Sequence, residues 1–515
     1  MKLQGYLKTI SLTTAFLLAV TGASSAASLV LAPTTPQLTL LDPVPGLLSG
    51  AAVTTNDNIL ATKGRKVQGA GADGATEMVL RIPTRSAGDQ FTITVENDQH
   101  QQSSSAAEDG ALGAIGSTSF TLSQLTVAAV ATSKGPMAFA IYLAPVDFPR
   151  PEGQDAGATE RFIYLQVTAL ASGSSSTTTV TLLRPPLVLV HGLWSDPTTW
   201  NNFTPLIGDA RFFIQEANYS TAIGSEITQY SPGLPFWSSP DSATTSALGF
   251  SYNAPTVLGQ IQNFVGEFKN SMNPAKIPVA GVQADIVAHS MGGDITRTLP
   301  LLTAYLSNNT LALGPIHKVV TIATPHWGSP LAGLMLDGND GCVRGVLADA
   351  GSVAFSSVTL NGKTTADGGV FDLEGDGFGG GLSAAITAFQ QPIPHPLPTA
   401  LIDGLESQSQ LDGLDSSATA LFIRLLCSGD TLANDLTSTG WPTIFNQDSD
   451  SIVPQLSELD GLTGTEVTGV IHSASSEQLG FGPPAELDAS SGVASVVINL
   501  LNTPVTSSTY IPLPQ

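Results

Sequence analysis

Short apolar runs with alternating polar positions fill the first third of the chain. Segments rich in Gly, Ser, Asn, Asp and Gln separate these runs, as turns separate the strands of an antiparallel sheet. The runs are Met78–Ile82, Phe91–Val95, Leu125–Val130, Ala138–Leu143, Phe162–Val167 and Thr177–Leu183. The pattern predicts an all-β, sandwich-like N-terminal domain over residues 28–184. No constellation of reactive side chains stands out in it, so the sequence assigns no chemistry to this domain.

The pattern changes after Pro185–Pro186. Continuous apolar runs now alternate with stretches of helical spacing, as expected of parallel strands buried on both faces and joined by helices. The predicted strands are Leu187–Val190, Arg211–Tyr219, Ala284–Ala288, Lys318–Ala323, Trp441–Phe445 and Glu466–Val470, and the predicted helices are Thr256–Met272, Met291 to Leu306, and Gly492–Leu501. Residues 185–515 are therefore predicted to form an α/β domain with a doubly wound, mostly parallel sheet.

Between residues 330 and 426 the alternation breaks down. Glycines and prolines accumulate there, as in Gly377–Gly381 and Pro392–Pro396. Such a segment inside an α/β domain often covers the active site. We therefore predict a cap or lid insertion over residues 330–426, with a purely structural surface excursion as the alternative.

The first 27 residues have the pattern of a secretory signal peptide. Lys2 and Lys8 supply a basic start, Ile10–Val20 is an apolar run too short to span a bilayer, and Ala23–Ala27 offers small residues for cleavage. No later stretch is long and apolar enough for a convincing membrane helix. We therefore expect a secreted protein, extracellular or periplasmic, without an integral membrane segment after removal of the signal.

The net charge of the chain limits which ligands it can bind, and its cysteine content limits which disulfides it can form. The chain has 42 Asp and Glu residues and 19 Lys and Arg residues, so its net charge is −23. No basic cluster offsets this negative charge. Nucleic acid and anionic membrane surfaces are disfavoured for that reason, whereas a neutral ester or lipid substrate meets no repulsion. The two cysteines, Cys342 and Cys427, can form one disulfide in an exported protein.

The strongest chemical signal is Ala288-His-Ser-Met-Gly-Gly293, which follows a buried strand and opens a helix. A sharp strand-to-helix turn strains the central residue and pushes its side chain above the sheet. Small residues are needed two positions before and after it, and Ala288 and Gly292 meet that need. The helix N-terminus stabilises developing negative charge. Ser290 is therefore the predicted nucleophile.

A second signal lies in Leu187–Trp194, where a buried strand ends in His-Gly. Sites of parallel sheets form at this carboxyl edge, and Gly192 permits a tight turn there. The N–H groups of Leu193 and Met291 are the predicted donors of an oxyanion hole. The alternative interpretation is a plain turn after a strand.

A serine hydroxyl needs a base, and seven histidines are available. His472 follows the last predicted strand, which is the place for the base when the chain order is serine, acid, histidine. The acid must lie between them at the end of a strand. Asp450, in the segment Asp448–Pro454 after the predicted strand Trp441–Asn446, is our choice, and Asp448 is the reserve.

These segments resemble those of bacterial lipases and esterases of the α/β-hydrolase superfamily. The resemblance runs from about Pro186 to Leu501 and excludes the N-terminal β domain. It is carried by Val188-Leu-Val-His-Gly-Leu193, Ala284–Gly293, Val320–Pro330 with its Thr-Pro-His-Trp-Gly-Ser-Pro, and Asp450-Ser-Ile-Val-Pro454 with the later Gly-Val-Ile-His472. It implies a triad and an oxyanion hole made of Ser290, Asp450, His472, Leu193 and Met291. Ser451 stands where glycine is common in the family, which leaves Asp448 open as the acid.

The function that this resemblance implies is a secreted serine carboxylic ester hydrolase, a lipase or esterase that works through a covalent acyl-enzyme. A polyester depolymerase or an acyltransferase on the same triad is the alternative among enzymes. Outside enzymes, the alternative is a surface-binding protein with an inert hydrolase unit. No cofactor is expected. Some relatives bind calcium near the catalytic histidine, and the oxygen ligands available here, without a calcium-loop spacing, are Asp337, Asp340, Asp372, Glu374 and Asp376.

Overall fold

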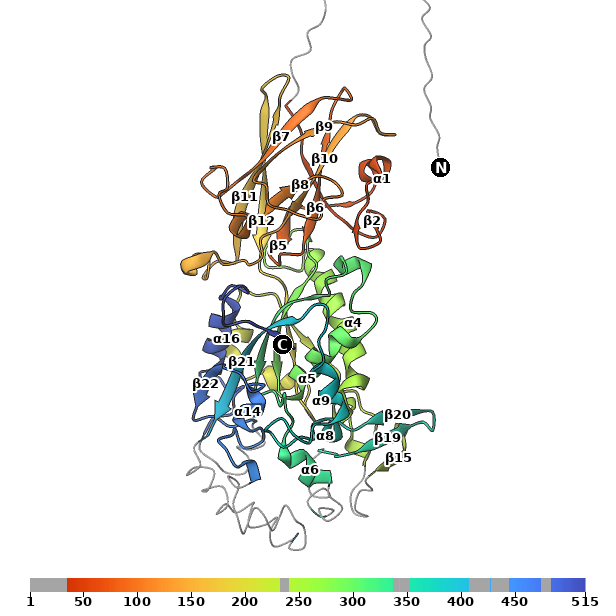
Figure 1. Cartoon of the computed structure of the whole chain (residues 1–515), viewed down its shortest axis with the longest axis vertical. Coiled ribbons are helices and arrows are strands. Elements are labelled where there is room, and N and C mark those ends of the chain that lie inside the picture. Colours follow the sequence, from red (N-terminus) through yellow and green to blue (C-terminus); the bar gives the residue numbers. More distant parts are fainter. Residues whose placement is uncertain are drawn as a thin grey trace, which may run out of the picture. The chain divides into compact units, whose positions relative to one another are not determined.

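The computed structural model describes residues 35–231, 240–336, 342, 352–406, 427, 444–473 and 483–514 (Figure 1). The predicted signal peptide and two of the predicted calcium ligands, Asp337 and Asp340, lie outside these residues. Among the described residues, no helix combines the length and the apolar character that crossing a membrane requires.

Two sheets facing each other form the core of the N-terminal part, beside a two-stranded sheet of β2 (Leu48–Ser49) and β3 (Ala52–Val53). One has the strand order β4 (Arg65–Lys66), β1 (Thr39–Asp42), β6 (Glu77–Pro83), β10 (Met137–Leu143) and β8 (Ala111–Gly113). The other has the order β16 (Val279–Ala280), β5 (Gly69–Gly71), β12 (Ser175–Leu183), β11 (Glu160–Ala169), β7 (Gln90–Glu96) and β9 (Gln124–Ala128). Alternate residues of β6 and β11 are fully buried in one apolar cluster, because side chains alternate between the faces of a strand. All six predicted runs overlap strands of this sandwich.

One strand of the second sheet comes from beyond the predicted domain boundary at residue 184. β16 pairs in parallel with β5, with Val279 opposite Gly69. Directly after β16, the N–H groups of Val282 and Gln283 donate to Asp73 Oδ2 at 3.1 and 3.0 Å. The α/β part of the chain therefore supplies a strand to the sandwich between two strands of its own central sheet.

A seven-stranded sheet forms the centre of the α/β part. Its order is β14 (Ile214–Ala217), β13 (Leu187–Val190), β17 (Ala284–His289), β18 (Ile316–Ile322), β21 (Leu397–Leu405) and β22 (Thr465–Thr468), and β23 (Ile511–Leu513) pairs with β21. Every pair is parallel except β21 with β23. The chain runs from β13 out to β14 and then returns to β17 on the other side of β13. Sites of such sheets lie at the carboxyl ends of the strands beside this reversal.

Helices cover both faces of this sheet (Figure 1). α4 (Phe250–Lys269), α5 (Met291–Thr298) and α9 (Ala384–Phe389) pack on one face, and α3 (Thr204–Ile207) and α16 (Val493–Leu501) pack on the other. Alternate residues of β13 enter the two apolar clusters, so this strand is buried from both sides. α5 ends well before the predicted Leu306, because Pro300 cannot continue an α-helix.

The predicted insertion of residues 330–426 needs correction, because it contains β21, a strand of the central sheet. Prolines up to Pro398 obscured the start of this strand, where it pairs only with the short strand β23. The predicted strand Trp441–Phe445 is also wrong: Ile444 and Phe445 are helical, and residues 441–443 lie outside the described part. The parallel strand that precedes the Asp448–Pro454 segment is β21.

Two strands of the segment before β21 pair with a strand from the connection between β14 and β17 in a small antiparallel sheet. Its strands are β15 (Ile227–Ser231), β19 (Ser357–Leu360) and β20 (Thr364–Asp367). Trp194, which follows the predicted oxyanion residue, packs against this subdomain and donates from its ring N–H to Val353 O at 2.9 Å. Cys342 and Cys427 form a disulfide, as the sequence predicted.

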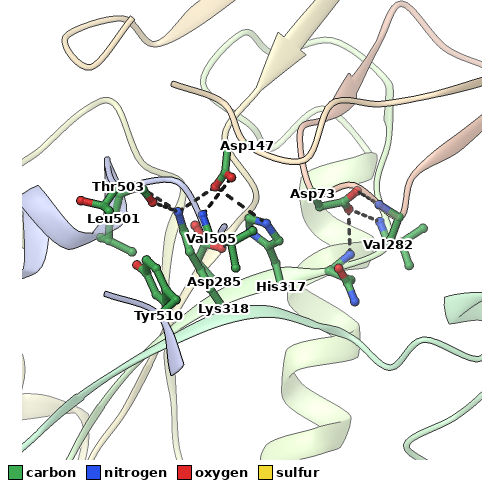
Figure 2. Close-up of polar contacts among 12 residues, drawn as sticks. Asp73, Asp147, Val282, Asp285, His317, Lys318, Leu501, Thr503, Val505 and Tyr510 are labelled. Carbon is green, nitrogen blue, oxygen red and sulfur yellow. Dashed lines mark hydrogen bonds and ion pairs between the residues drawn. The ribbon is translucent and has the colours of Figure 1, made fainter. Parts of the chain in front are cut away.

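Buried polar contacts join the sandwich to the α/β part (Figure 2). Asp147, between β10 and β11, accepts hydrogen bonds from Lys318 Nζ at 3.1 Å and from Val505 N at 3.0 Å. Lys318 Nζ also donates to the carbonyl oxygens of Leu501 and Thr503, each at 3.1 Å. The sandwich is therefore bound to a central strand and to the C-terminal segment through one buried cluster.

Candidate active site

Ser290 lies in the sharp turn between β17 and α5. Its backbone has φ +56° and ψ −137°, a conformation that an L-residue holds only where the surrounding structure supports it. Ser290 N donates to Ile322 O of the neighbouring strand at 2.9 Å, which fixes the turn. The hydroxyl consequently stands at the carboxyl edge of the sheet and at the N-terminus of a helix.

Two glycines allow the backbone to crowd around this turn. A Cβ atom on Gly192 would lie 2.7 Å from Ser290 Cβ and 3.1 Å from its Oγ. A Cβ atom on Gly292 would overlap the carbonyl oxygens of Val190 and His191. The small residues of both sequence motifs are therefore required by the close approach of β13 to the turn.

His472 connects this serine to a carboxylate. Its Nε2 lies 2.9 Å from Ser290 Oγ, and its Nδ1 is hydrogen-bonded to Asp450 Oδ2. His472 N also donates to Asp450 O at 3.0 Å, which ties the two segments together. Ser290, His472 and Asp450 are 8%, 6% and 0% exposed, so all three residues are buried and Asp450 is fully shielded from water.

Asp450 is oriented by its own loop. Its Oδ1 accepts hydrogen bonds from Ile452 N at 2.8 Å and Val453 N at 2.6 Å, so both carboxylate oxygens are engaged. Ser451 has φ +84°, in the region that glycine adopts without strain, at the position where the family resemblance expects glycine. Asp448 is exposed, and the structure brings Asp450 to His472.

The acid loop is anchored at the end of β21. Glu406, directly after this strand, bridges to Ser449, and its N–H donates to Ser449 O at 3.0 Å. Many residues separate these two partners in the chain, and most of them lie outside the described part. Proximity in sequence therefore favoured the wrong strand, whereas the pairing of distant segments sets the position of the acid.

The predicted oxyanion donors flank Ser290. Leu193 follows the close-packed Gly192, and Met291 is the first residue of α5; neither N–H has an acceptor among the described residues. The ring of His191 stacks on Tyr219, with 3.9 Å between centroids, and the Tyr219 hydroxyl donates to His191 O. Burial lowers the pKa of His191 to about 4, so a neutral ring supports this loop.

Two glutamates that the sequence analysis did not select adjoin the triad. Glu486 Oε2 is 3.3 Å from His289 Nε2, and the same nitrogen is 3.1 Å from the carbonyl oxygen of His472. One oxygen each of Asp450, Glu458 and Glu486 lies within 4.8 Å of the other two. In the sequence, each glutamate stands in a short Glu-Leu-Asp segment, a pattern that many surface loops share.

Several candidate metal ligands among the described residues are already engaged with other groups of the protein. Asp372, a predicted calcium ligand, already accepts a hydrogen bond from Phe250 N at 2.7 Å. Two groups of side chains are close enough to share an ion, His289 with His472 and Glu486, and Asp450 with Glu458 and Glu486. His472 and Asp450 are committed to each other in these groups, so the donors do not fit a resident metal, and calcium stays a prediction.

No protein-family model matches this chain, and no curated protein matches it. Similar solved structures include the mature form of the Bacillus licheniformis lipase BlEst2, at 14% identity and a TM-score of 0.33 over 62% of this chain and 92% of that one. The Staphylococcus hyicus lipase is similar at 15% identity and a TM-score of 0.32, over 61% and 93%. An extracellular α/β-hydrolase from a Paenibacillus species is similar at 12% identity and a TM-score of 0.21, over 42% and 77%. Likeness at this level transfers no residue role to this chain.

Proposed function

We propose that this chain is a secreted serine carboxylic ester hydrolase, a lipase or esterase, with Ser290 as its nucleophile. The observation that carries the proposal is the 2.9 Å contact between His472 Nε2 and Ser290 Oγ, continued by the hydrogen bond from His472 to Asp450. A nucleophile, a base and an acid that orients the base are what acyl transfer requires. Secretion rests on the signal-peptide pattern, and the disulfide supports it.

In the first half-reaction, the Ser290 oxygen attacks the ester carbonyl carbon while His472 Nε2 takes the hydroxyl proton. Asp450 keeps the other imidazole proton on Nδ1 and stabilises the imidazolium. The N–H groups of Leu193 and Met291 donate to the oxyanion, and each such donor contributes roughly 3–4 kcal/mol to stabilising the transition state. The tetrahedral intermediate then expels the alcohol, which takes the proton from His472.

In the second half-reaction, water attacks the acyl-enzyme with His472 again as base, and the carboxylic acid leaves as Ser290 regains its proton. A small cavity lies beside His472 and is lined in part by Thr199, Asn202 and Leu487. A neutral ester or lipid is the proposed substrate, because a protein of net charge −23 repels anionic ones.

The test replaces Ser290 with alanine in the full chain. We expect Ser290→Ala to lower kcat for a short-chain nitrophenyl ester by at least about 10³-fold and to abolish labelling by a fluorophosphonate. The matched control, Ser172→Ala, removes an exposed hydroxyl of the sandwich and should keep both activities. Substantial turnover by Ser290→Ala would reject the proposed nucleophile.

A substrate panel separates the related activities. Faster release of acid from emulsified triglyceride than from polyester film favours a lipase over a depolymerase, and transfer to an added alcohol in preference to water favours an acyltransferase. Absence of fluorophosphonate labelling in the wild-type protein would favour a surface-binding protein with an inert hydrolase unit.

A further inference from the structure

A group of buried carboxyl groups adjoins the triad acid. Asp450, Glu458 and Glu486 are each 0% exposed, and one oxygen of each lies within 4.8 Å of the other two. In the part of the chain that the structure describes, their ion-pair partners are the histidines His472 and His289, and no Lys or Arg pairs with them. Three negative charges without a cation cannot be held together in a site of such low polarity.

The hydrogen bonds of the two glutamates indicate how the charge is avoided. Glu458 Oε2 accepts from Gly404 N of β21 at 2.8 Å, and Glu486 Oε2 faces His289 Nε2 at 3.3 Å. The remaining oxygen of each glutamate, Oε1, is buried and has no partner within the described residues. A Cβ atom on Gly404 would overlap Glu486 Oε1, so the two carboxyl groups converge on the same point of the backbone. A carboxylic acid has an O–H donor with which to meet a neighbouring oxygen there, and a carboxylate has none.

The titration behaviour of the surrounding groups agrees with this geometry. Burial raises the pKa of Glu458 and of Glu486 well above the usual range, and the charge of Asp450 adds to the effect. Burial also raises the pKa of Asp403, whose negative charge would in turn raise the pKa of both glutamates. Burial lowers the pKa of His289 well below its usual value, so this ring is neutral. Of the three carboxyl groups, Asp450 is the one that is hydrogen-bonded to the imidazole of His472.

We propose that Glu458 and Glu486 are positioning residues of the triad, which as neutral carboxylic acids pack against Asp450 and His289 and hold the acid and base in line with Ser290. This inference rests on the proposed function of the site. When the pair loses a proton, a second negative charge arises beside Asp450, and repulsion between the two displaces the acid loop. The glutamates therefore set an upper pH limit on the reactivity of the serine.

The test uses Glu486→Gln in the full chain, because an amide keeps an N–H donor and cannot ionise. We measure the rate of fluorophosphonate labelling, and kcat and KM for a nitrophenyl ester, from neutral to strongly alkaline pH. The wild-type rates should fall at alkaline pH, and Glu486→Gln should move that fall upward by about one pH unit or more. The same variant should lower kcat at neutral pH by roughly three- to tenfold and leave KM within about twofold.

Glu77→Gln is the matched control. Glu77 is a glutamate of β6 in the sandwich, and burial raises its pKa to about 7. Removing this ionisation changes how stability depends on pH, but it should leave the pH profile of labelling as in the wild-type protein. If Glu486→Gln fails to fold, Glu458→Gln is measured in the same way.

Superimposable labelling profiles of wild type and Glu486→Gln would overturn the inference. A metal ion that copurifies in stoichiometric amount with the wild-type protein and is lost in Glu486→Gln would overturn it too, because a cation would then neutralise the carboxylates. A wild-type protein that fluorophosphonate labels but that hydrolyses no ester would reject the proposed function alone, since the labelling profile still tests the glutamates.

Discussion

Lys318 of the central sheet and Asp147 of the sandwich form a 3.1 Å ion pair in which the two side chains are 2% and 4% exposed. Lys318 Nζ has three protons to donate, and its partners are Asp147 and the carbonyl oxygens of Leu501 and Thr503. A buried ion pair is tolerated only when it is hydrogen-bonded in this way. The sandwich is therefore built into the α/β part and is not merely tethered to it.

Lys318→Met removes the nearer basic partner of the buried Asp147 and leaves only His317 Nε2, at 3.9 Å. We expect it to lower the free energy of unfolding by about 3–5 kcal/mol, measured by urea unfolding followed by tryptophan fluorescence. The control Asp98→Asn breaks an ion pair with Arg150 in which Asp98 is 43% exposed, and it should cost less than about 1 kcal/mol. Equal stability of Lys318→Met and wild type would show that the sandwich is not held through this contact.

Asp450→Asn and Asp448→Asn distinguish the two candidate acids. Asp450 is buried and bonded to His472, whereas Asp448 is exposed. Asp450→Asn should lower kcat for a nitrophenyl ester by about 10³–10⁴-fold, because the imidazole loses the partner that fixes its tautomer. Asp448→Asn should stay within about twofold of wild type. The reverse result would transfer the role to Asp448.

Gly292→Ala tests the close packing at the nucleophile turn. The added methyl group would overlap the carbonyl oxygens of Val190 and His191, so we expect little soluble protein and no labelling of Ser290. Gly259 of α4 has open space around its Cβ position, and Gly259→Ala should raise stability by about 0.5–1 kcal/mol because alanine favours the helix. Soluble yield and thermal unfolding by circular dichroism measure both. A stable, active Gly292→Ala would contradict the observed packing.

Asp372 makes stability depend on pH. Burial raises the pKa of its carboxyl group to about 7, against the hydrogen bond that it accepts from Phe250 N at 2.7 Å. Since the folded protein then binds a proton that the unfolded chain has lost, stability should fall as pH rises from about 4 to about 7. Asp372→Asn keeps an oxygen for Phe250 and removes the ionisation, so its stability should fall less. Urea unfolding across this range compares the two proteins, and parallel curves would show that Asp372 ionises at its ordinary pKa.

Features with a local signal could be predicted from the sequence. The strand, the turn and the helix around Ser290 follow one another directly in the chain. A single sequence segment therefore shows both the turn and the small residues that the turn requires. The same holds for Gly192 after β13, and for the sandwich strands, whose period-two alternation reports their own burial. The chain order serine, acid, histidine then limited the choice of partners for Ser290.

Only the tertiary structure decided which strand anchors the loop of Asp450, which strand the α/β part contributes to the sandwich, and which carboxyl groups surround Asp450. Prolines and a glycine interrupt the apolar pattern of β21, and β16 is too short to give a pattern of its own. Glu458 and Glu486 are separated along the chain and meet only when the segments around β21 pack together. A sequence pattern reports the environment of residues that are neighbours in the chain. Contacts between distant residues depend on how whole helices and strands fill the interior, and single sequence positions do not encode that packing.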